Sequence, residues 1–150
     1  MILTPEEVLA MVPQQEPFRF IDQIIKIDEA HIVSEYRFRP EADFYRGHFP
    51  GNPVTPGVIL LEAMAQSAVV ALGIYVAVKT LGIEETNKLL TFFTDADVEF
   101  SGVVRPGDRV TTSAKVVFFR RRKMRSQAEM RLDDGTVVCS GTISGMGIER

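Results

Sequence analysis

The sequence predicts an α+β fold in which a curved antiparallel sheet of five or six strands wraps around one long apolar helix. Residues 57–78 are apolar at nearly every position, which is typical of a helix buried on all sides. From residue 89 onward, strand-forming runs alternate with turn signals. A helix that is hydrophobic all round must be covered all round, and a strongly curved sheet closed by a partner subunit is the simplest cover.

The first third of the chain predicts one short helix and two strands. Thr4 is placed as an N-cap, and Glu7 completes a capping box three residues later, so a helix is expected to run to Met11. Residues 18–28 are rich in Phe and Ile and predict a first strand. Residues 32–39 alternate between apolar and polar side chains and predict a second strand with one wet face.

The remaining elements are a loop, the long helix and a run of strands. Residues 40–55 form a long loop whose aromatic residues and prolines indicate order, and an ordered long loop is usually functional. The long helix is expected to begin at Thr55–Pro56–Gly57 and to end near Gly82, followed by a polar connector. Turns at 105–108 and 133–135 separate strands predicted at residues 89–100, 109–123, 124–132 and 136–147. No repeat or linker divides the chain, so residues 1–150 are expected to form a single domain of the architecture called a hot dog.

Composition and charge exclude several classes of protein. A net charge of −3 argues against a dedicated nucleic-acid binder. Cys139 is the only cysteine and cannot form an internal disulfide, and we expect it to be buried and inert. Two histidines cannot assemble a Cys/His metal cluster, so no metal is expected, although a carboxylate-rich site stays open. The N-terminus carries glutamates where a signal peptide carries basic residues, which favours a cytoplasmic protein.

The apolar segment 57–78 is also long enough to span a bilayer. It contains Glu62 and Gln66, however, and a carboxylate within a membrane span costs about 3 kcal/mol on insertion scales. The flanking loops show no strong Lys/Arg asymmetry. We therefore expect a helix buried by protein and no membrane span.

A base, an acid and oxyanion donors lie within one short stretch. His48 stands in a proline-stiffened loop, and imidazole is suited to proton abstraction. Gly57 lies in the first helical turn, where free N–H groups can bind a negatively charged oxygen. Glu62 follows among apolar neighbours, and such burial raises a carboxyl pKa. Gln66 lies one turn later on the same face and could hydrogen-bond that carboxyl.

Each of these residues also has a structural interpretation. A lone histidine near Phe and Pro is often structural, and a lone glutamate in an apolar helix can pair with an arginine from elsewhere. Together with the glycine at the helix start, they favour chemistry beside a carbonyl, where an enolate must be stabilised.

The stretch "GHFPGNPVTPGVILLEAMAQSA" resembles the hallmark of the FabZ-type β-hydroxyacyl-acyl-carrier-protein dehydratases of the FabA/FabZ family. "PFRFID" at 17–22 and "VEFSGVVRPGD" at 98–108 are similar to further elements of that family. The likeness covers residues 12–145.

The resemblance implies a hot-dog fold and the dehydration of (3R)-3-hydroxyacyl thioesters to trans-2-enoyl thioesters. It implies no metal or cofactor. The substrate is carried on the phosphopantetheine of acyl carrier protein. It implies that His48 is the catalytic histidine, Glu62 the catalytic acid and Gln66 a supporting residue. The amides of Gly57 and Val58 would hold the thioester carbonyl. FabA-type enzymes carry aspartate at the Glu62 position, so glutamate favours dehydration without isomerisation.

The family also implies a homo-oligomer, with a dimer as the minimum unit and a trimer of dimers as a larger form. Its active sites take the histidine and the acid from different subunits. Phe49 and Phe100 are candidates for the acyl tunnel. The basic run Arg120, Arg121, Arg122 and Lys123 is a candidate docking patch for the acidic carrier protein, although a solvated strand end is the simpler interpretation.

The sequence departs from the family pattern at Thr55, where Met is usual, and at Tyr45–Arg46, where Phe-Gln is commoner. These departures leave open whether the substrate belongs to fatty acid synthesis or to a specialised acyl chain such as a polyene. Other open alternatives are a hot-dog thioesterase, an enoyl-CoA hydratase that runs the reverse reaction, and a non-catalytic acyl-carrier or lipid-binding domain.

Overall fold

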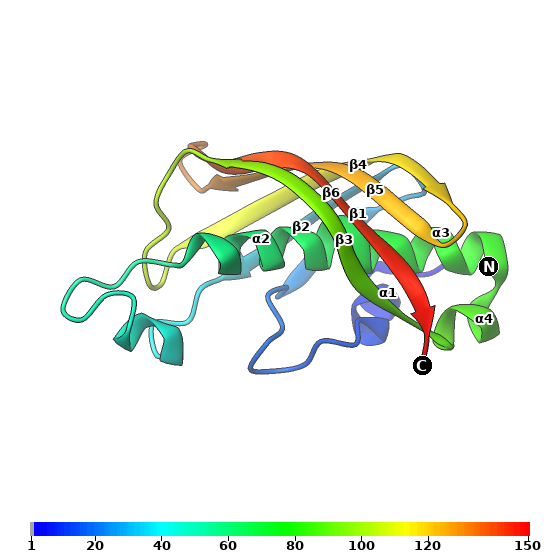
Figure 1. Cartoon of the computed structure of the whole chain (residues 1–150), viewed down its shortest axis with the longest axis horizontal. Coiled ribbons are helices and arrows are strands. Elements are labelled where there is room, and N and C mark those ends of the chain that lie inside the picture. Colours follow the sequence, from blue (N-terminus) through cyan, green and yellow to red (C-terminus); the bar gives the residue numbers. More distant parts are fainter. Residues whose placement is uncertain (1) are drawn as a thin grey trace.

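A computed structural model of the chain describes residues 2–150 (Figure 1). Six antiparallel strands form one sheet in the order β1-β2-β4-β5-β6-β3. The sheet curves over one long helix, which runs along its concave side (Figure 1). This is the predicted hot-dog arrangement. The strands are β1 (Gln23–Ile27), β2 (His31–Arg37), β3 (Leu89–Phe100), β4 (Arg109–Arg120), β5 (Lys123–Leu132) and β6 (Val137–Glu149).

The N-terminal helix α1 (Pro5–Met11) begins with the predicted capping box. The Glu7 backbone N–H donates to the Thr4 hydroxyl at 3.2 Å, and the Thr4 N–H donates to the Glu7 carboxylate at 3.1 Å. These bonds satisfy two backbone donors that the first helical turn leaves free. Val8 on the inner face of α1 is fully buried in the core.

The central helix is continuous over Gly57–Leu81 and consists of three segments, α2 (Gly57–Ala65), η2 (Gln66–Ala71) and α3 (Leu72–Leu81). The helix is long enough to span a membrane, and its most apolar 18-residue stretch has a mean hydropathy of 1.9. However, 61% of that stretch is buried inside the protein. The apolar surface of this helix therefore faces the sheet, and burial of that surface is the main stabilising contribution of the core.

The middle segment η2 is a π-helix, which the sequence does not predict. Its irregular backbone carbonyls find partners in the core: the Ser126 hydroxyl donates to the Ala68 carbonyl at 2.6 Å. The Ser34 and Ser67 hydroxyls pair at 2.5 Å beside it. Because π-turns change which side chains face one side of a helix, this segment alters the lining of the space under the sheet.

Four local expectations are corrected. The predicted first strand begins only at Gln23, because the Phe18 carbonyl and the Phe20 N–H bond to the Gln66 side chain of the central helix and not to a neighbouring strand. The polar connector after the central helix forms a short helix, α4 (Ile83–Asn87), and the long loop contains a 3-10 turn, η1 (Asp43–Arg46). The strand predicted at 109–123 ends at Arg120, because positive φ angles at Arg121 and Arg122 make a tight hairpin turn there.

Strand β3 lies at one edge of the sheet and pairs only with β6 among the described residues. Its side chains are exposed on both faces over much of its length, and Phe92, Phe93 and Phe100 are about half exposed. A long edge strand with exposed aromatic residues offers free backbone groups and apolar surface to a further strand.

Candidate active site

Glu62 is a half-buried carboxyl in the second turn of α2. It lines a cavity of about 40 Å³ together with Ala65, Val69, Phe93 and other residues of the helix, β3 and β6. Burial raises the pKa of Glu62 above its ordinary value, and a hydrogen bond from Gln66 partly opposes that rise. The carboxyl is thereby favoured in its protonated, donating form relative to an exposed glutamate.

Gln66 is fully buried and fixes the Glu62 carboxylate. Its Nε2 donates to Glu62 Oε2 at 2.9 Å and to the Phe18 carbonyl at 2.8 Å. Its Oε1 accepts the Phe20 backbone N–H at 2.7 Å. Both N–H groups and the oxygen of the amide are therefore used, which leaves it one orientation.

The backbone of Phe18 and Phe20 is thus part of the site's support. Sequence reasoning assigned these residues to a strand and missed this role. The only hint in the sequence was the similarity of "PFRFID" at 17–22 to a family element. That similarity suggests that the segment has a fixed role, but it does not show that Gln66 is its partner.

His48 lies in a small closed loop before α2. The ring Nδ1 and the Val54 carbonyl are 2.9 Å apart, and a carbonyl can only accept, so Nδ1 carries the proton. Nε2 is then the lone-pair nitrogen available as a base. The Val54 N–H returns a hydrogen bond of 2.9 Å to the His48 carbonyl, and the His48 ring stacks on Phe49 with centroids 4.1 Å apart.

The start of α2 offers two backbone donors. Pro56 is the N-cap residue, and its carbonyl accepts the N–H groups of Ile59 and Leu60. Within residues 2–150, the Gly57 and Val58 N–H groups have no hydrogen-bond acceptor. A Cβ on Gly57 would lie 3.4 Å from the Phe100 ring, so the absent side chain leaves space at this helix tip. Two free amides at a helix N-terminus can stabilise a negatively charged oxygen.

A single chain does not bring all the predicted residues together. Glu62 lines the cavity described above, whereas the loop 47–54 with His48 is not among the residues that line it. Phe49 and Phe100 do not line this cavity or the second cavity described below, so their role in an acyl tunnel stays a prediction.

A second cavity of about 40 Å³ adjoins the first, and sequence reasoning missed it. The two share the lining residues Val69, Val70, Thr91 and Gly145. The second cavity runs along the helix to Ala77, which is roughly 22 Å from Glu62 at about 1.5 Å per residue.

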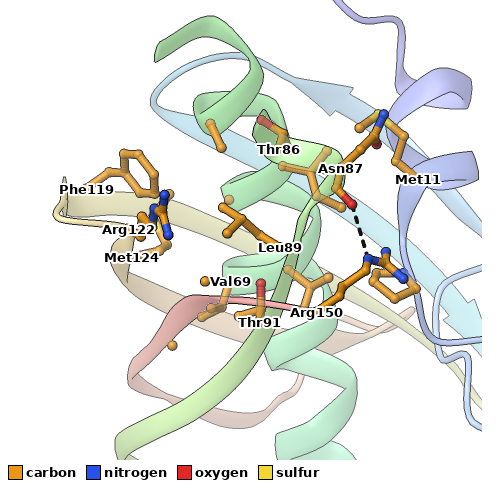
Figure 2. A pocket seen from close by; sticks show the side chains of 17 residues that line it. Met11, Val69, Thr86, Asn87, Leu89, Thr91, Phe119, Arg122, Met124 and Arg150 are labelled. Carbon is orange, nitrogen blue, oxygen red and sulfur yellow. Dashed lines mark hydrogen bonds between the residues drawn. The ribbon is translucent and has the colours of Figure 1, made fainter. Parts of the chain in front are cut away.

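The walls of the second cavity are mostly apolar, with polar side chains at its far end (Figure 2). There Arg150 Nε donates to the Asn87 carbonyl at 3.1 Å, and Arg122 also reaches the cavity (Figure 2). Gly145 is the tight point between the cavities, because a Cβ there would lie 2.6 Å from Val69 Cγ1.

The basic run lies on the β4–β5 hairpin, beside the second cavity and not beside Glu62. Arg122 pairs with Glu149 at 3.6 Å and Lys123 with Asp95 at 3.3 Å. The guanidinium of Arg120 lies over the Phe118 ring at 4.2 Å. Arg120 and Arg121 are exposed, whereas Arg122 and Lys123 are partly buried, so the first two are the most accessible members of the run.

Comparison with known sequences decides the family. The family described as the FabA-like domain matches residues 12–142. The chain belongs to this family. A 3-hydroxyacyl-[acyl-carrier-protein] dehydratase FabZ of Streptococcus pyogenes is 34% identical over 140 residues, covering 92% of this chain and 94% of the relative. The FabZ of Chloroflexus aggregans is 33% identical over 135 residues, covering 89% and 88%.

Solved structures confirm the hot-dog fold. The dehydratase heterocomplex ApeI:P from Xenorhabdus doucetiae aligns with a TM-score of 0.78 at 14% identity, over 99% of this chain and 93% of that chain. The thioesterase HI1161 from Haemophilus influenzae aligns with a TM-score of 0.67 at 16% identity, over 99% and 93%. Because dehydratases and thioesterases share the fold at this low identity, these likenesses establish architecture alone.

We expect a Gln66→Met substitution to destabilise the fold by roughly 1–3 kcal/mol, because it leaves the buried Phe20 N–H without an acceptor. Urea unfolding of the wild type and the variant measures the difference. Gln127→Met, at an exposed position of β5, is the matched control and should be nearly neutral. A Gln66→Met protein as stable as the control would contradict the supporting role of this amide.

Proposed function

We propose that the protein dehydrates (3R)-3-hydroxyacyl thioesters carried on acyl carrier protein to trans-2-enoyl thioesters. The observation that carries this proposal is the half-buried Glu62, whose pKa is raised by burial and whose carboxylate is oriented by Gln66 at the wall of a cavity. Membership of the FabA-like family and the names of the FabZ relatives support the same reaction.

The residues divide the reaction between a base, an acid and two oxyanion donors. His48 Nε2 takes the proton from C2 of the substrate, while the Nδ1–H bond to Val54 stabilises the imidazolium that forms. The Gly57 and Val58 N–H groups bind the thioester oxygen as it gains enolate charge. The C3–O bond then breaks, the electron pair of the enolate forms the C2–C3 double bond, and Glu62 supplies a proton to the departing hydroxyl, directly or through water.

A dimer completes the site in this proposal. Within residues 2–150 the outer edge of strand β3 pairs with no other strand, its aromatic side chains are exposed, and its Thr91 and Phe93 line the Glu62 cavity. A second copy paired along this edge would cover the cavity from the side on which its own chain leaves it open. The base would then reach Glu62 from the partner subunit, which accounts for the absence of His48 from the cavity within one chain.

The carrier protein is the proposed partner, and exposed Arg120 and Arg121 are the proposed contact for its acidic surface. The adjoining second cavity would receive the acyl chain beyond the reacting carbons. Its length supports a long acyl chain. We place the enzyme in the cytoplasm as a single domain over residues 1–150, with no membrane span.

A thioesterase is the second candidate, because the fold is shared with thioesterases and a helix tip and a carboxylate also suit thioester hydrolysis. The two reactions give different products from a 3-hydroxyacyl thioester: the enoyl thioester absorbs in the ultraviolet, and hydrolysis releases a thiol. Ellman's reagent is a clean probe here, since Cys139 is buried and burial raises its pKa to about 12. Thiol release without enoyl absorbance would replace the dehydratase proposal, and a non-catalytic domain would give neither signal.

Subunit mixing tests the shared site. We expect His48→Ala and Glu62→Gln proteins to be inactive alone, because each dimer then lacks the base or the acid in both sites. After equal mixing and refolding, roughly a quarter of wild-type activity should return, because half of the dimers are mixed and each holds one complete site.

Each variant refolded alone serves as the control for that experiment. The assay follows enoyl thioester absorbance. If the mixture stays as inactive as its components, although both variants fold and associate, the two residues do not work across a subunit boundary.

The second cavity predicts a chain-length effect at Gly73. A Cβ at Gly73 would meet no atom within 4 Å, so a Gly73→Leu side chain can enter the cavity without a clash. We expect kcat/KM for 3-hydroxyhexadecanoyl thioesters to fall about tenfold or more, and that for 3-hydroxybutanoyl thioesters to stay unchanged. Thr80→Leu, exposed on the same helix, is the control. Equal losses on both substrates would show that the long chain does not use this cavity.

A further inference from the structure

Two buried hydroxyl groups meet at the base of the loop that carries His48. Tyr45 Oη and Thr55 Oγ1 lie 2.6 Å apart, and the two residues are only 5% and 6% exposed. Tyr45 belongs to η1, just before the loop, and Thr55 comes just after it. This hydrogen bond therefore ties together the two ends of residues 46–54.

Few other hydrogen bonds hold the loop, and those that join its two sides are the bonds between His48 and Val54. The Val54 N–H and carbonyl bond to the backbone and the ring of His48, and a tight turn between Phe49 and Asn52 closes the tip. Thr55 is anchored to the body of the protein, because its N–H donates to the Val104 carbonyl at 2.8 Å.

Thr55 thus connects the two halves of the candidate site. The residue before it, Val54, supplies the carbonyl that orients the His48 ring, and two residues after it Gly57 begins α2. A small rotation of Thr55 would move the carbonyl of Val54 and the helix tip relative to one another. Such displacements of a base by about 1 Å can lower a rate a hundredfold.

We propose that Tyr45 and Thr55 are positioning residues that hold the His48 imidazole in its Nδ1-protonated form and in register with the Gly57 amide. This inference rests on the proposed role of His48 as the base. Neither hydroxyl is assigned a contact with substrate; both act through the Val54 carbonyl.

A gain in folding stability does not by itself explain why two hydroxyl groups are buried together here. Burying two hydroxyls requires their desolvation, and a net hydrogen bond in a protein contributes little more than two apolar groups of similar shape would. A hydrogen bond differs from apolar contact in its direction, which fixes the relative orientation of the two chain segments.

The kinetic test uses the variants Tyr45→Phe and Thr55→Val, each of which removes one hydroxyl and keeps the shape. We expect kcat for the 3-hydroxyacyl thioester to fall about tenfold with KM unchanged, because orientation of the base is lost while the binding cavity is intact. The double variant should be no slower than the slower single variant, because both changes break one bond. Thr55→Ser keeps the hydroxyl and should keep the rate.

Imidazole ¹⁵N spectra provide a readout that a purely structural role would not change. The chain has only two histidines, His31 and His48, so a His31→Gln protein assigns the signals. His31 is exposed at the start of β2, away from the candidate site. In alkaline buffer we expect wild-type His48 to show a protonated Nδ1, and Tyr45→Phe to show a mixture of the two tautomers.

A lower kcat together with a shifted tautomer balance supports the positioning role. An unchanged kcat, or a lower kcat with the wild-type tautomer, overturns it and leaves the pair a structural contact. If Tyr45→Phe fails to fold by circular dichroism, Thr55→Val decides by the same two readouts. The spectra do not depend on turnover. An inactive wild type would therefore refute the proposed function, while the tautomer comparison would still test whether the Tyr45–Thr55 hydrogen bond positions His48.

Discussion

One buried amide, Gln66, sets the chemistry of the central helix. The helix must be apolar to fill the concave side of the sheet, and a carboxyl within it must be both desolvated and held. Gln66 resolves this conflict by donating to Glu62 and to the Phe18 carbonyl while accepting from the Phe20 N–H. The N-terminal segment is thereby joined to the helix interior, and the carboxyl gains one orientation without gaining a counter-charge.

The same packing that buries Glu62 also shapes the space beside it. The π-segment η2 presents the successive residues Val69 and Val70 to both cavities, and Gly145 of β6 allows the sheet to approach Val69 closely. Core packing and the proposed acyl channel are therefore properties of the same side chains. At the other end, the backbone of Gly57 and the closed loop around His48 are set by Tyr45 and Thr55, outside that channel.

Much of the architecture follows from local rules in the sequence. The capping box at Thr4, the apolar run after Gly57 and the turn residues around the strands predicted the elements, because each depends on neighbouring residues alone. The Glu62–Gln66 hydrogen bond was foreseeable from their i, i+4 spacing.

The missed features depend on contacts between distant parts of the chain. Gln66 reaches Phe18 across 48 positions, and the two cavities combine the helix with β3 and β6. The pairing of Tyr45 with Thr55 also required the loop to be folded. The central claim, that Glu62 is a desolvated acid moderated by Gln66, is tested most directly by titrating a ¹³C-labelled Glu62 carboxyl by NMR. We predict a pKa above the ordinary glutamate value, and a higher one in Gln66→Leu, because the opposing hydrogen bond is lost. A Glu62 pKa at or below the ordinary value would contradict the account.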